Sequence, residues 1–255
     1  MSQTPQDFSW YDVMTTDVAA SKAFYEHVVG WTIADSGMPS HYMLLSAGAD
    51  LVGGLMDIPA DAKAAGARPG WSGYVGVADV DESAKAVKAL GGAIHKAPED
   101  IPGVGRFSVV ADPDGATLVL FQSFHDVPAS APAGTPGHFG WHELYAGDLD
   151  RDFAFYSKLF GWTKAGTHDM GEMGPYLMFA AGKDPIGGMM KKPKEVPHPF
   201  WLYYINVASI DDAIAKTKAA GGQIILGPVE VPGGSWIAQA TDPQGAMFAM
   251  VAAKR

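Results

Sequence analysis

The chain has 255 residues, a formal net charge of −10 and no cysteine. A hydrophobic fraction of 47% and a charged fraction of 18% exclude a disordered chain, and the length allows two domains of ordinary size. The 31 glycines and 18 prolines exceed average usage and favour many short elements over a bundle of long helices. The acidic balance argues against a nucleic-acid partner. No apolar run is long enough for a membrane helix, the start lacks a secretory signal, and the missing cysteines fit a cytoplasmic location.

An internal repeat organises the sequence. Six of the seven tryptophans occur at matched positions of two copies, in the same order along the chain. The matched positions are Trp10 and Trp141, Trp31 and Trp162, Trp71 and Trp201, Phe24-Tyr25 and Phe155-Tyr156, Tyr42 and Tyr176, and Asp112-Pro113 and Asp242-Pro243. The repeat predicts a domain over residues 8–122, a linker rich in proline and glycine over 123–138, and a second domain over 139–252.

The first copy opens with a predicted strand over residues 9–14. A helix is expected over 18–29, because Ala20, Ala23, Phe24 and Val28 recur at helical spacing. Asp17 is its expected N-cap, and Gly30 is expected to end it. Each helix of the chain is expected to be followed by a short strand.

Two further strands are predicted over residues 42–46 and 51–56. The pair Gly53-Gly54 lies inside the second of these strands, and Gly187-Gly188 occupies the matching place in the second copy. Glycines inside a strand predict a bulge or a sharp bend.

The second half of the first copy repeats the same order of elements. A strand is predicted over residues 72–77, and then a helix over 82–90 with Asp81 as its N-cap. Strands over 106–111 and 117–121 follow, joined by the tight turn of Asp112-Pro-Asp-Gly.

The second copy predicts helices over residues 149–159 and 211–220 and a turn over 242–245. The chain is therefore expected to be an α+β protein of four βαβββ modules. Whether the modules pair within each copy, or first with fourth and second with third, is left open by the sequence.

This pattern resembles the vicinal oxygen chelate superfamily, which contains the glyoxalases, bleomycin-resistance proteins and extradiol dioxygenases. The resemblance rests on Trp-x-Asp/Glu in a strand, a helix-leading Asp, Phe-Tyr, Gly-Trp and Asp-Pro-x-Gly, and it covers both copies. It implies two glyoxalase-like domains, each with a sheet closed around a cleft for a small molecule.

The resemblance also implies a divalent metal held by His and Glu side chains. The corresponding positions hold no good metal ligand, since an indole nitrogen is only a donor. These positions are Trp10 and Trp141, Ser72 and Leu202, and Val119 and Ala249. The sequence therefore predicts no cofactor and no metal-ligand residues, and Trp10 and Trp141 become candidate walls of an apolar cleft.

Two carboxylates are the candidate catalytic or anchoring groups. Strand alternation places Asp12 with Trp10 and Met14, and Glu143 with Trp141 and Tyr145, on otherwise apolar faces. A buried carboxylate needs a partner or a raised pKa, so a structural hydrogen bond is the alternative interpretation.

The remaining candidate ligand-binding residues are Tyr74 and Tyr204, a matched pair two residues beyond Ser72 and Leu202. Aromatic walls with a phenol suit a planar or amphipathic molecule, although a core role is the alternative. His142 is expected to point away from the cleft.

The sequence thus favours a glyoxalase/bleomycin-resistance-like protein that binds a small apolar or aromatic molecule without the usual metal, either as a binding protein or as a metal-free catalyst. One alternative is a metal-dependent lyase or dioxygenase with relocated ligands such as Glu143 and His168. The other is a scaffold protein with vestigial clefts. The expected partner is a small molecule, and the expected state is a monomer or a homodimer.

Overall fold

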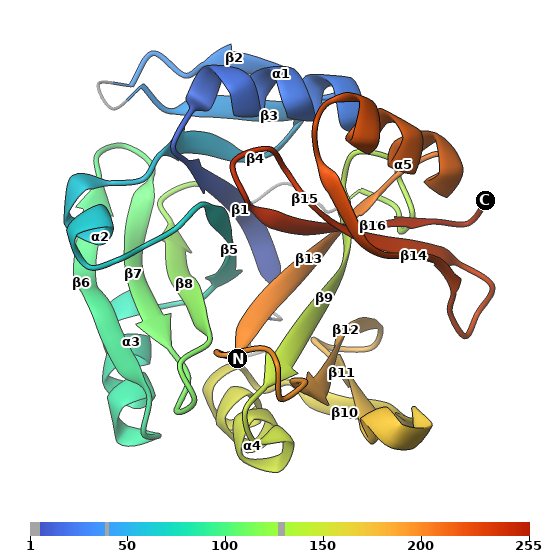
Figure 1. Cartoon of the computed structure of the whole chain (residues 1–255). Coiled ribbons are helices and arrows are strands. Elements are labelled where there is room, and N and C mark those ends of the chain that lie inside the picture. Colours follow the sequence, from blue (N-terminus) through green and yellow to red (C-terminus); the bar gives the residue numbers. More distant parts are fainter. Residues whose placement is uncertain (1–5, 39–40, 127–130) are drawn as a thin grey trace. The chain divides into compact units, whose positions relative to one another are not determined.

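The computed structural model describes residues 6–38, 41–126 and 131–255 (Figure 1). Residues 1–5, at the start of the chain, and residues 127–130, within the expected linker, lie outside the described residues. The first copy contains β1 (Phe8–Thr15), α1 (Val18–Val28), β2 (Thr32–Asp35), β3 (Met43–Ala47), β4 (Asp50–Asp57), α2 (Ala60–Ala64), β5 (Gly70–Gly76), α3 (Val80–Ala89), β6 (Ala93–Ile101), β7 (Gly105–Ala111) and β8 (Thr117–Ser123).

The second copy repeats this order of elements. It contains β9 (Phe139–Ala146), α4 (Leu149–Phe160), β10 (Thr163–Asp169), the short 3-10 helix η1 (Gly171–Met173), β11 (Pro175–Ala180), β12 (Pro185–Lys191), β13 (Phe200–Asn206), α5 (Ile210–Ala219), β14 (Gln223–Glu230), β15 (Trp236–Thr241) and β16 (Met247–Ala252). The predicted α+β class with four βαβββ modules is confirmed, including the short strand after each long helix.

The strands form two eight-stranded sheets with the same order of modules. The orders are β2-β3-β4-β1-β5-β8-β7-β6 and β10-β11-β12-β9-β13-β16-β15-β14. Within each module the first and last strands pair in parallel, as β1 does with β4, and the other pairs are antiparallel. In the part of the chain that the structure describes, no helix is both long and apolar enough to cross a membrane.

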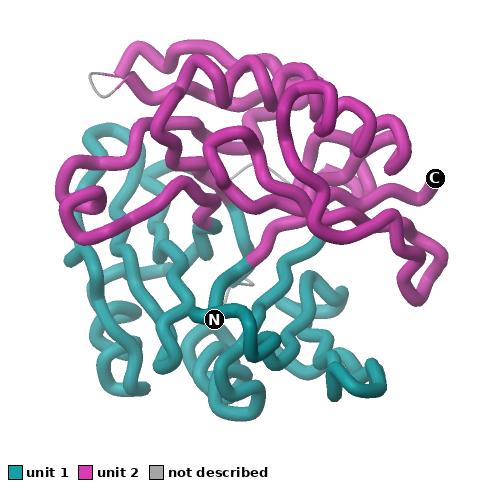
Figure 2. The backbone as a smooth tube through the Cα atoms, viewed as in Figure 1, with its two compact units in different colours: residues 1–9, 73–129, 141–201 teal, residues 10–72, 130–140, 202–255 magenta. Residues whose placement is uncertain are grey.

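The chain divides into two compact units, drawn in different colours in Figure 2. Unit 1 comprises Met1–Ser9, Gly73–Ala129 and Trp141–Trp201, and unit 2 comprises Trp10–Ser72, Ser130–Gly140 and Leu202–Arg255. Each unit thus combines one module of the first copy with one module of the second, which is the pairing of first with fourth and second with third. The domain boundaries expected from the repeat remain a prediction.

In unit 2 a relay of hydrogen bonds from a half-buried tryptophan through a buried tyrosine to a buried aspartate joins the two copies. The indole nitrogen of Trp71 donates to the hydroxyl of Tyr25 at 3.0 Å, and this hydroxyl donates to Oδ2 of Asp242 at 3.1 Å. Oδ1 of Asp242 accepts from the backbone N–H groups of Gln244 and Ala246, so the same carboxylate fixes the Asp-Pro-x-Gly turn. Burial and the nearby carboxylate raise the pKa of Tyr25, which keeps its phenol a donor.

Unit 1 contains the same relay built from the matched residues. Trp201 donates to the hydroxyl of Tyr156 at 3.0 Å, and that hydroxyl donates to Oδ2 of Asp112 at 2.9 Å. Six of the residues that define the repeat therefore have a structural role in these contacts, because a phenol, an indole and a carboxylate removed from water must each find a partner.

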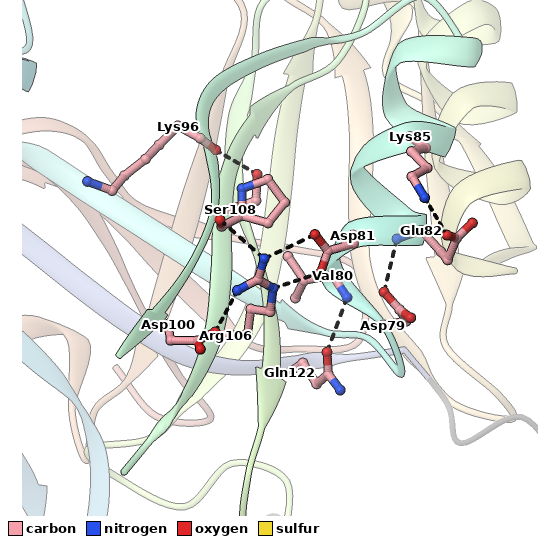
Figure 3. Close-up of polar contacts among 11 residues, drawn as sticks. Asp79, Val80, Asp81, Glu82, Lys85, Lys96, Asp100, Arg106, Ser108 and Gln122 are labelled. Atoms are coloured by element: carbon pink, nitrogen blue, oxygen red, sulfur yellow. Dashed lines mark hydrogen bonds and ion pairs between the residues drawn. The ribbon is translucent and has the colours of Figure 1, made fainter. Parts of the chain in front are cut away.

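Side-chain caps begin the long helices. Asp17 accepts from the backbone of Ala20 at 3.0 Å and begins α1 as predicted, and Gly30 follows the end of that helix at φ +84°. The predicted start of α3 is wrong. Its N-cap is Asp79, which accepts from the backbone of Glu82, and its first residue is Val80 (Figure 3).

Asp81 lies in the first turn of α3 and has a different role. The guanidinium of Arg106, on β7, donates to both oxygens of Asp81 at 2.7 and 3.0 Å and to Asp100 at 2.6 Å (Figure 3). Asp79 and Asp81 are both residue types that cap helices, so the local sequence does not separate them. Their roles differ because Asp81 pairs with the distant Arg106, whereas Asp79 caps the helix.

Candidate functional site

In unit 2 the structure brings Trp10 and Asp12 together with Tyr42, which precedes β3. The indole nitrogen of Trp10 lies 2.9 Å from Oδ1 of Asp12 and 2.8 Å from the hydroxyl of Tyr42. The hydroxyl of Tyr42 donates to the same carboxylate oxygen at 2.6 Å. Asp12 is only 4% exposed, and its carboxylate is therefore fixed by a phenol and an indole.

In unit 1 the matched residues form a second cluster. The indole of Trp141 donates to the hydroxyl of Tyr176 at 2.8 Å, and this hydroxyl is hydrogen-bonded to the carboxylate of Glu143. Glu143 is 7% exposed. Burial, followed by the neighbouring carboxylate, raises the pKa of both Tyr42 and Tyr176, so each phenol remains a neutral donor.

Glycines on the neighbouring strands make room for these tyrosines. A Cβ at Gly54 would overlap the hydroxyl of Tyr42, and a Cβ at Gly188 would overlap the ring of Tyr176. The predicted irregularity is confirmed, since the ladder shifts register beside Gly53 and beside Gly187. The glycine pairs thus lie at irregular positions of the strands, and their lack of a Cβ leaves the space through which each phenol reaches its carboxylate.

Tyr42 and Tyr176 were not among the predicted site residues. The two tyrosines occupy matched positions of the repeat, and this match could have indicated a role in the site. It was equally consistent with packing in the core. The strand register explains the position of Tyr42. Gly54 pairs with Asp12 on one side and with Leu44 on the other, so Asp12 and Leu44 lie on the same face of the sheet. Tyr42 precedes Leu44 by two residues and therefore lies on that face as well.

The other predicted residues lie outside the two clusters. Met14 pairs with Met56 and is half-buried. The ring of Tyr145 stacks on Phe200 at 4.7 Å.

The predicted pair of tyrosines differs between the copies. Tyr74 makes an edge contact with Phe121 at 6.0 Å, whereas the hydroxyl of buried Tyr204 accepts from Nε2 of Gln239 at 3.0 Å. Gln239 was missed by the sequence reasoning, because its counterpart Val109 is apolar and gave no repeated pattern.

His142 points away from Trp141, as the strand alternation predicts. Its ring stacks on Phe8 at 4.1 Å, and Nδ1 lies 2.6 Å from the carbonyl oxygen of Ile186. Burial lowers the pKa of His142 to about 4, so the ring is neutral at pH 7.

The side chains present do not supply the superfamily's usual metal donors. Among the described residues no group of three or more His, Cys, Asp or Glu side chains is placed to hold a metal ion. His168 lies opposite Tyr176 in the β10–β11 ladder, but its ring and the Glu143 carboxylate form no such group.

Two of the cavities among the described residues are lined by residues outside the two clusters. One of about 220 Å³ lies beside the N-terminal end of α4 in unit 1, and one of about 300 Å³ lies beside Thr15 and Asp57 in unit 2. Neither is lined by a predicted site residue.

The chain belongs to the Glyoxalase/Bleomycin resistance protein/Dioxygenase superfamily, whose family model matches residues 8–120 and 135–250. A putative glyoxylase, CFP32, of Mycobacterium tuberculosis is 32% identical over 246 residues, which cover 95% of this chain and 93% of that protein. The anthracycline biosynthesis protein DauV of a Streptomyces species is 29% identical, over 95% of this chain and 92% of that protein.

Solved structures share the fold at low sequence identity. The Mn(II)-bound glyoxalase from Novosphingobium aromaticivorans has a TM-score of 0.68 at 18% identity, covering 100% of this chain and 84% of that one. The 2,2',3-trihydroxybiphenyl 1,2-dioxygenase from Sphingomonas wittichii also has a TM-score of 0.68, at 11% identity, over 98% of this chain and 91% of that one.

Proposed function

We propose that this protein binds a small, largely aromatic molecule at its two Trp–Tyr–carboxylate clusters, in the cytoplasm and without a bound metal. The observation that carries the proposal is the convergence of the Trp10 indole and the Tyr42 hydroxyl on Oδ1 of Asp12, at 2.9 and 2.6 Å. In the second copy the Trp141 indole donates to the Tyr176 hydroxyl, which is hydrogen-bonded to the Glu143 carboxylate. A purely apolar core would have no need of a buried carboxylate at this position.

The clusters combine an apolar surface with one fixed acceptor. An indole and a phenol offer wide, rigid faces for ring stacking, and their own polar atoms are already paired. A carboxylate has about four acceptor positions, so a hydroxyl on the ligand can add to the donors already in place. This combination suits a planar molecule with one hydrogen-bond donor.

The relatives support an aromatic ligand. Two of them, DauV and DnrV from Streptomyces, are named as anthracycline biosynthesis proteins and match 95% of this chain. Anthracyclines are fused aromatic ring systems that carry hydroxyl groups. A molecule of this class would place rings against Trp10 or Trp141 and a hydroxyl against the neighbouring carboxylate.

A metal-free proton transfer is the catalytic form of the same proposal. Asp12 or Glu143 would accept a proton from the bound molecule, and the phenol beside it would keep the resulting carboxyl group oriented. In the non-catalytic form the same carboxylates only anchor the ligand.

Binding of daunorubicin, followed by tryptophan fluorescence and by calorimetry on EDTA-treated protein, tests the proposal. We expect saturable binding that Trp10→Phe and Tyr42→Phe weaken. Trp236→Phe is the matched control, because Trp236 has no counterpart in the repeat and packs against the Arg255 guanidinium. Binding that disappears with EDTA and returns with a divalent metal would instead favour the metal-dependent lyase or dioxygenase.

A further inference from the structure

A cavity of about 300 Å³ lies at the ends of the parallel strands β1 and β4 in unit 2. Three segments form it: the end of β1 with the residue after it, the end of β4 with the residue after it, and the short helix α2. The lining residues are Thr15, Thr16, Asp57, Ile58, Ala60 and Lys63. All six belong to unit 2, so the cavity lies within one compact unit.

Three polar side chains of this cavity are exposed and available to a ligand. Asp57 is the last residue of β4, Thr16 follows β1, and Lys63 lies in α2. In the described part of the chain, the Asp57 carboxylate, the Lys63 ammonium and the Thr16 hydroxyl have no hydrogen bond or ion pair. A negative and a positive group thus line one cavity without pairing with each other.

The combination of Asp57 and Lys63 is particular to the first copy. The described second copy has no helix in the place of α2, because residues 192–199 connect β12 to β13 where residues 58–69 connect β4 to β5. The cavity of about 220 Å³ in unit 1 lies at the matched strand end, and there Lys191 ends β12 as Asp57 ends β4. The charge at the strand end is therefore reversed between the copies.

The cavity lies apart from the Trp–Tyr–carboxylate cluster of unit 2. Thr15 pairs with Asp57 in the ladder of β1 and β4, and it is three positions from Asp12, so the two residues project from opposite faces of the sheet. The hydroxyl of Thr15 accordingly lies 2.8 Å from that of Ser21 in α1. A ligand of the cavity does not need the cluster, so the two sites can be tested separately.

We propose that this cavity binds a zwitterion of the size of a free amino acid, with its ammonium group at Asp57 and its carboxylate at Lys63. The Thr16 hydroxyl can donate or accept a further hydrogen bond. An aliphatic side chain of the ligand would lie against Ile58 and Ala60, the apolar part of the lining. The volume is at the lower end of the roughly 300–1,000 Å³ of small-molecule sites, which suits a molecule of this size.

The reasoning is one of charge complementarity. Two unpaired opposite charges each favour a counter-charge, and a zwitterion supplies both in one molecule. A ligand with a single charge can pair with only one of the two groups. Because Asp57 and Lys63 are exposed, each pair contributes little, and we expect affinity in the millimolar range.

Three probes that differ only in charge test the proposal. Near neutral pH, L-valine carries both charges, L-valinamide carries only the ammonium group, and N-acetyl-L-valine carries only the carboxylate. Each is titrated into ¹⁵N-labelled full-length protein and into the variants Asp57→Asn and Lys63→Gln. The shifts of the backbone amide signals report both the affinity and the place of binding.

We expect L-valine to bind more tightly than either other probe and to shift the amide signals of residues 57–63. Asp57→Asn should weaken L-valine and L-valinamide roughly fivefold without weakening N-acetyl-L-valine. Lys63→Gln should weaken L-valine and N-acetyl-L-valine by a similar factor without weakening L-valinamide. These side chains are exposed, so both substitutions should leave the fold unchanged.

Lys191→Gln is the matched control, because it removes the lysine that lines the cavity of unit 1. It should leave the binding of all three probes unchanged. The proposal is wrong if L-valine shifts no amide signal of the cavity, if its binding depends on Lys191 instead of Lys63, or if each variant weakens the three probes equally. Daunorubicin binding should be the same in both cavity variants as in the wild type, so the failure of this proposal leaves the proposed function standing.

Discussion

The hydroxyl of Tyr25 donates a hydrogen bond to Oδ2 of Asp242, a residue 217 positions later in the chain. This bond joins the first module to the fourth, inside unit 2, and its counterpart between Tyr156 and Asp112 joins the third module to the second, inside unit 1. In both cases the phenol also accepts from an indole, so one hydroxyl is hydrogen-bonded to two side chains.

Tyr25→Phe should therefore destabilise the protein by more than the loss of one surface hydrogen bond. Oδ2 of buried Asp242 and the half-buried Trp71 indole would both lose a partner, and a buried polar atom left unpaired costs roughly 1–3 kcal/mol. Chemical denaturation measures the change, and Tyr156→Phe should show a similar one. A change below about 0.5 kcal/mol in both variants would contradict the relay.

Gly54→Ala should displace Tyr42 and weaken ligand binding at the unit 2 cluster, because the new Cβ would occupy the space of the Tyr42 hydroxyl. If overlap with Tyr42 is the cause, the Gly54→Ala substitution should cost less stability when Tyr42 is also replaced by Ala. A double-mutant cycle on the free energy of unfolding measures this difference. Gly70→Ala is the control, since the nearest atom to its Cβ would be the Arg68 carbonyl oxygen at 3.9 Å. Equal losses in the two glycine variants would contradict this role.

His142 should make stability fall in mild acid. Its pKa is about 4 in the folded protein and about 6.5 when exposed, so the unfolded chain binds the extra proton between these values. The stabilising contribution of the neutral ring is complete above pH 6.5 and is lost as the pH falls toward 4.

The substitution His142→Tyr isolates this effect. The matched residue of the first copy is Tyr11, whose ring stacks on Phe139 at 3.7 Å as His142 stacks on Phe8. Denaturation curves at pH 7 and pH 5 should show a smaller drop in the variant than in the wild type, by on the order of 1–2 kcal/mol. Parallel pH profiles for the two proteins would rule out His142 as the source.

Asp152 should make stability fall as the pH rises, which is the opposite of the effect of His142. Burial, followed by the charges of Asp112 and Asp114, raises its pKa to about 8, so the folded protein keeps a proton that the unfolded chain releases above about pH 4. Its contribution is therefore favourable below pH 4 and is lost as the pH rises toward 8.

Asp152→Asn should make the protein more stable than the wild type at pH 8 and nearly equal to it at pH 4. An amide cannot ionise, and its oxygen can still accept the backbone N–H of Gly147, as Oδ2 of Asp152 does at 3.2 Å. Thermal unfolding at the two pH values measures the difference. The matched contact in unit 2, between Ser21 and Gln244, is neutral, so Ser21→Ala should show no comparable pH dependence.

Local patterns in the amino-acid sequence predicted most of the elements and the family. Helical spacing with the cap Asp17 predicted α1, because a cap acts within three residues of the backbone group that it satisfies, and the repeat predicted α4. The matched tryptophans, tyrosines and aspartates predicted four modules in two copies. The prediction of Asp81 as the N-cap of α3 is wrong, because Asp79 caps this helix and Asp81 instead pairs with Arg106, 25 residues farther along the chain.

Which modules pack together, and which residues complete the clusters, depends on contacts between segments far apart in the sequence. Tyr42 reaches Asp12, and Gln239 reaches Tyr204, through strand registers that join segments more than 25 residues apart. Pairing between strands depends on the packing of the whole sheet, and the same alternating sequence is compatible with several partners. Local patterns therefore define the elements, whereas the chemistry of the candidate sites arises from long-range contacts between them.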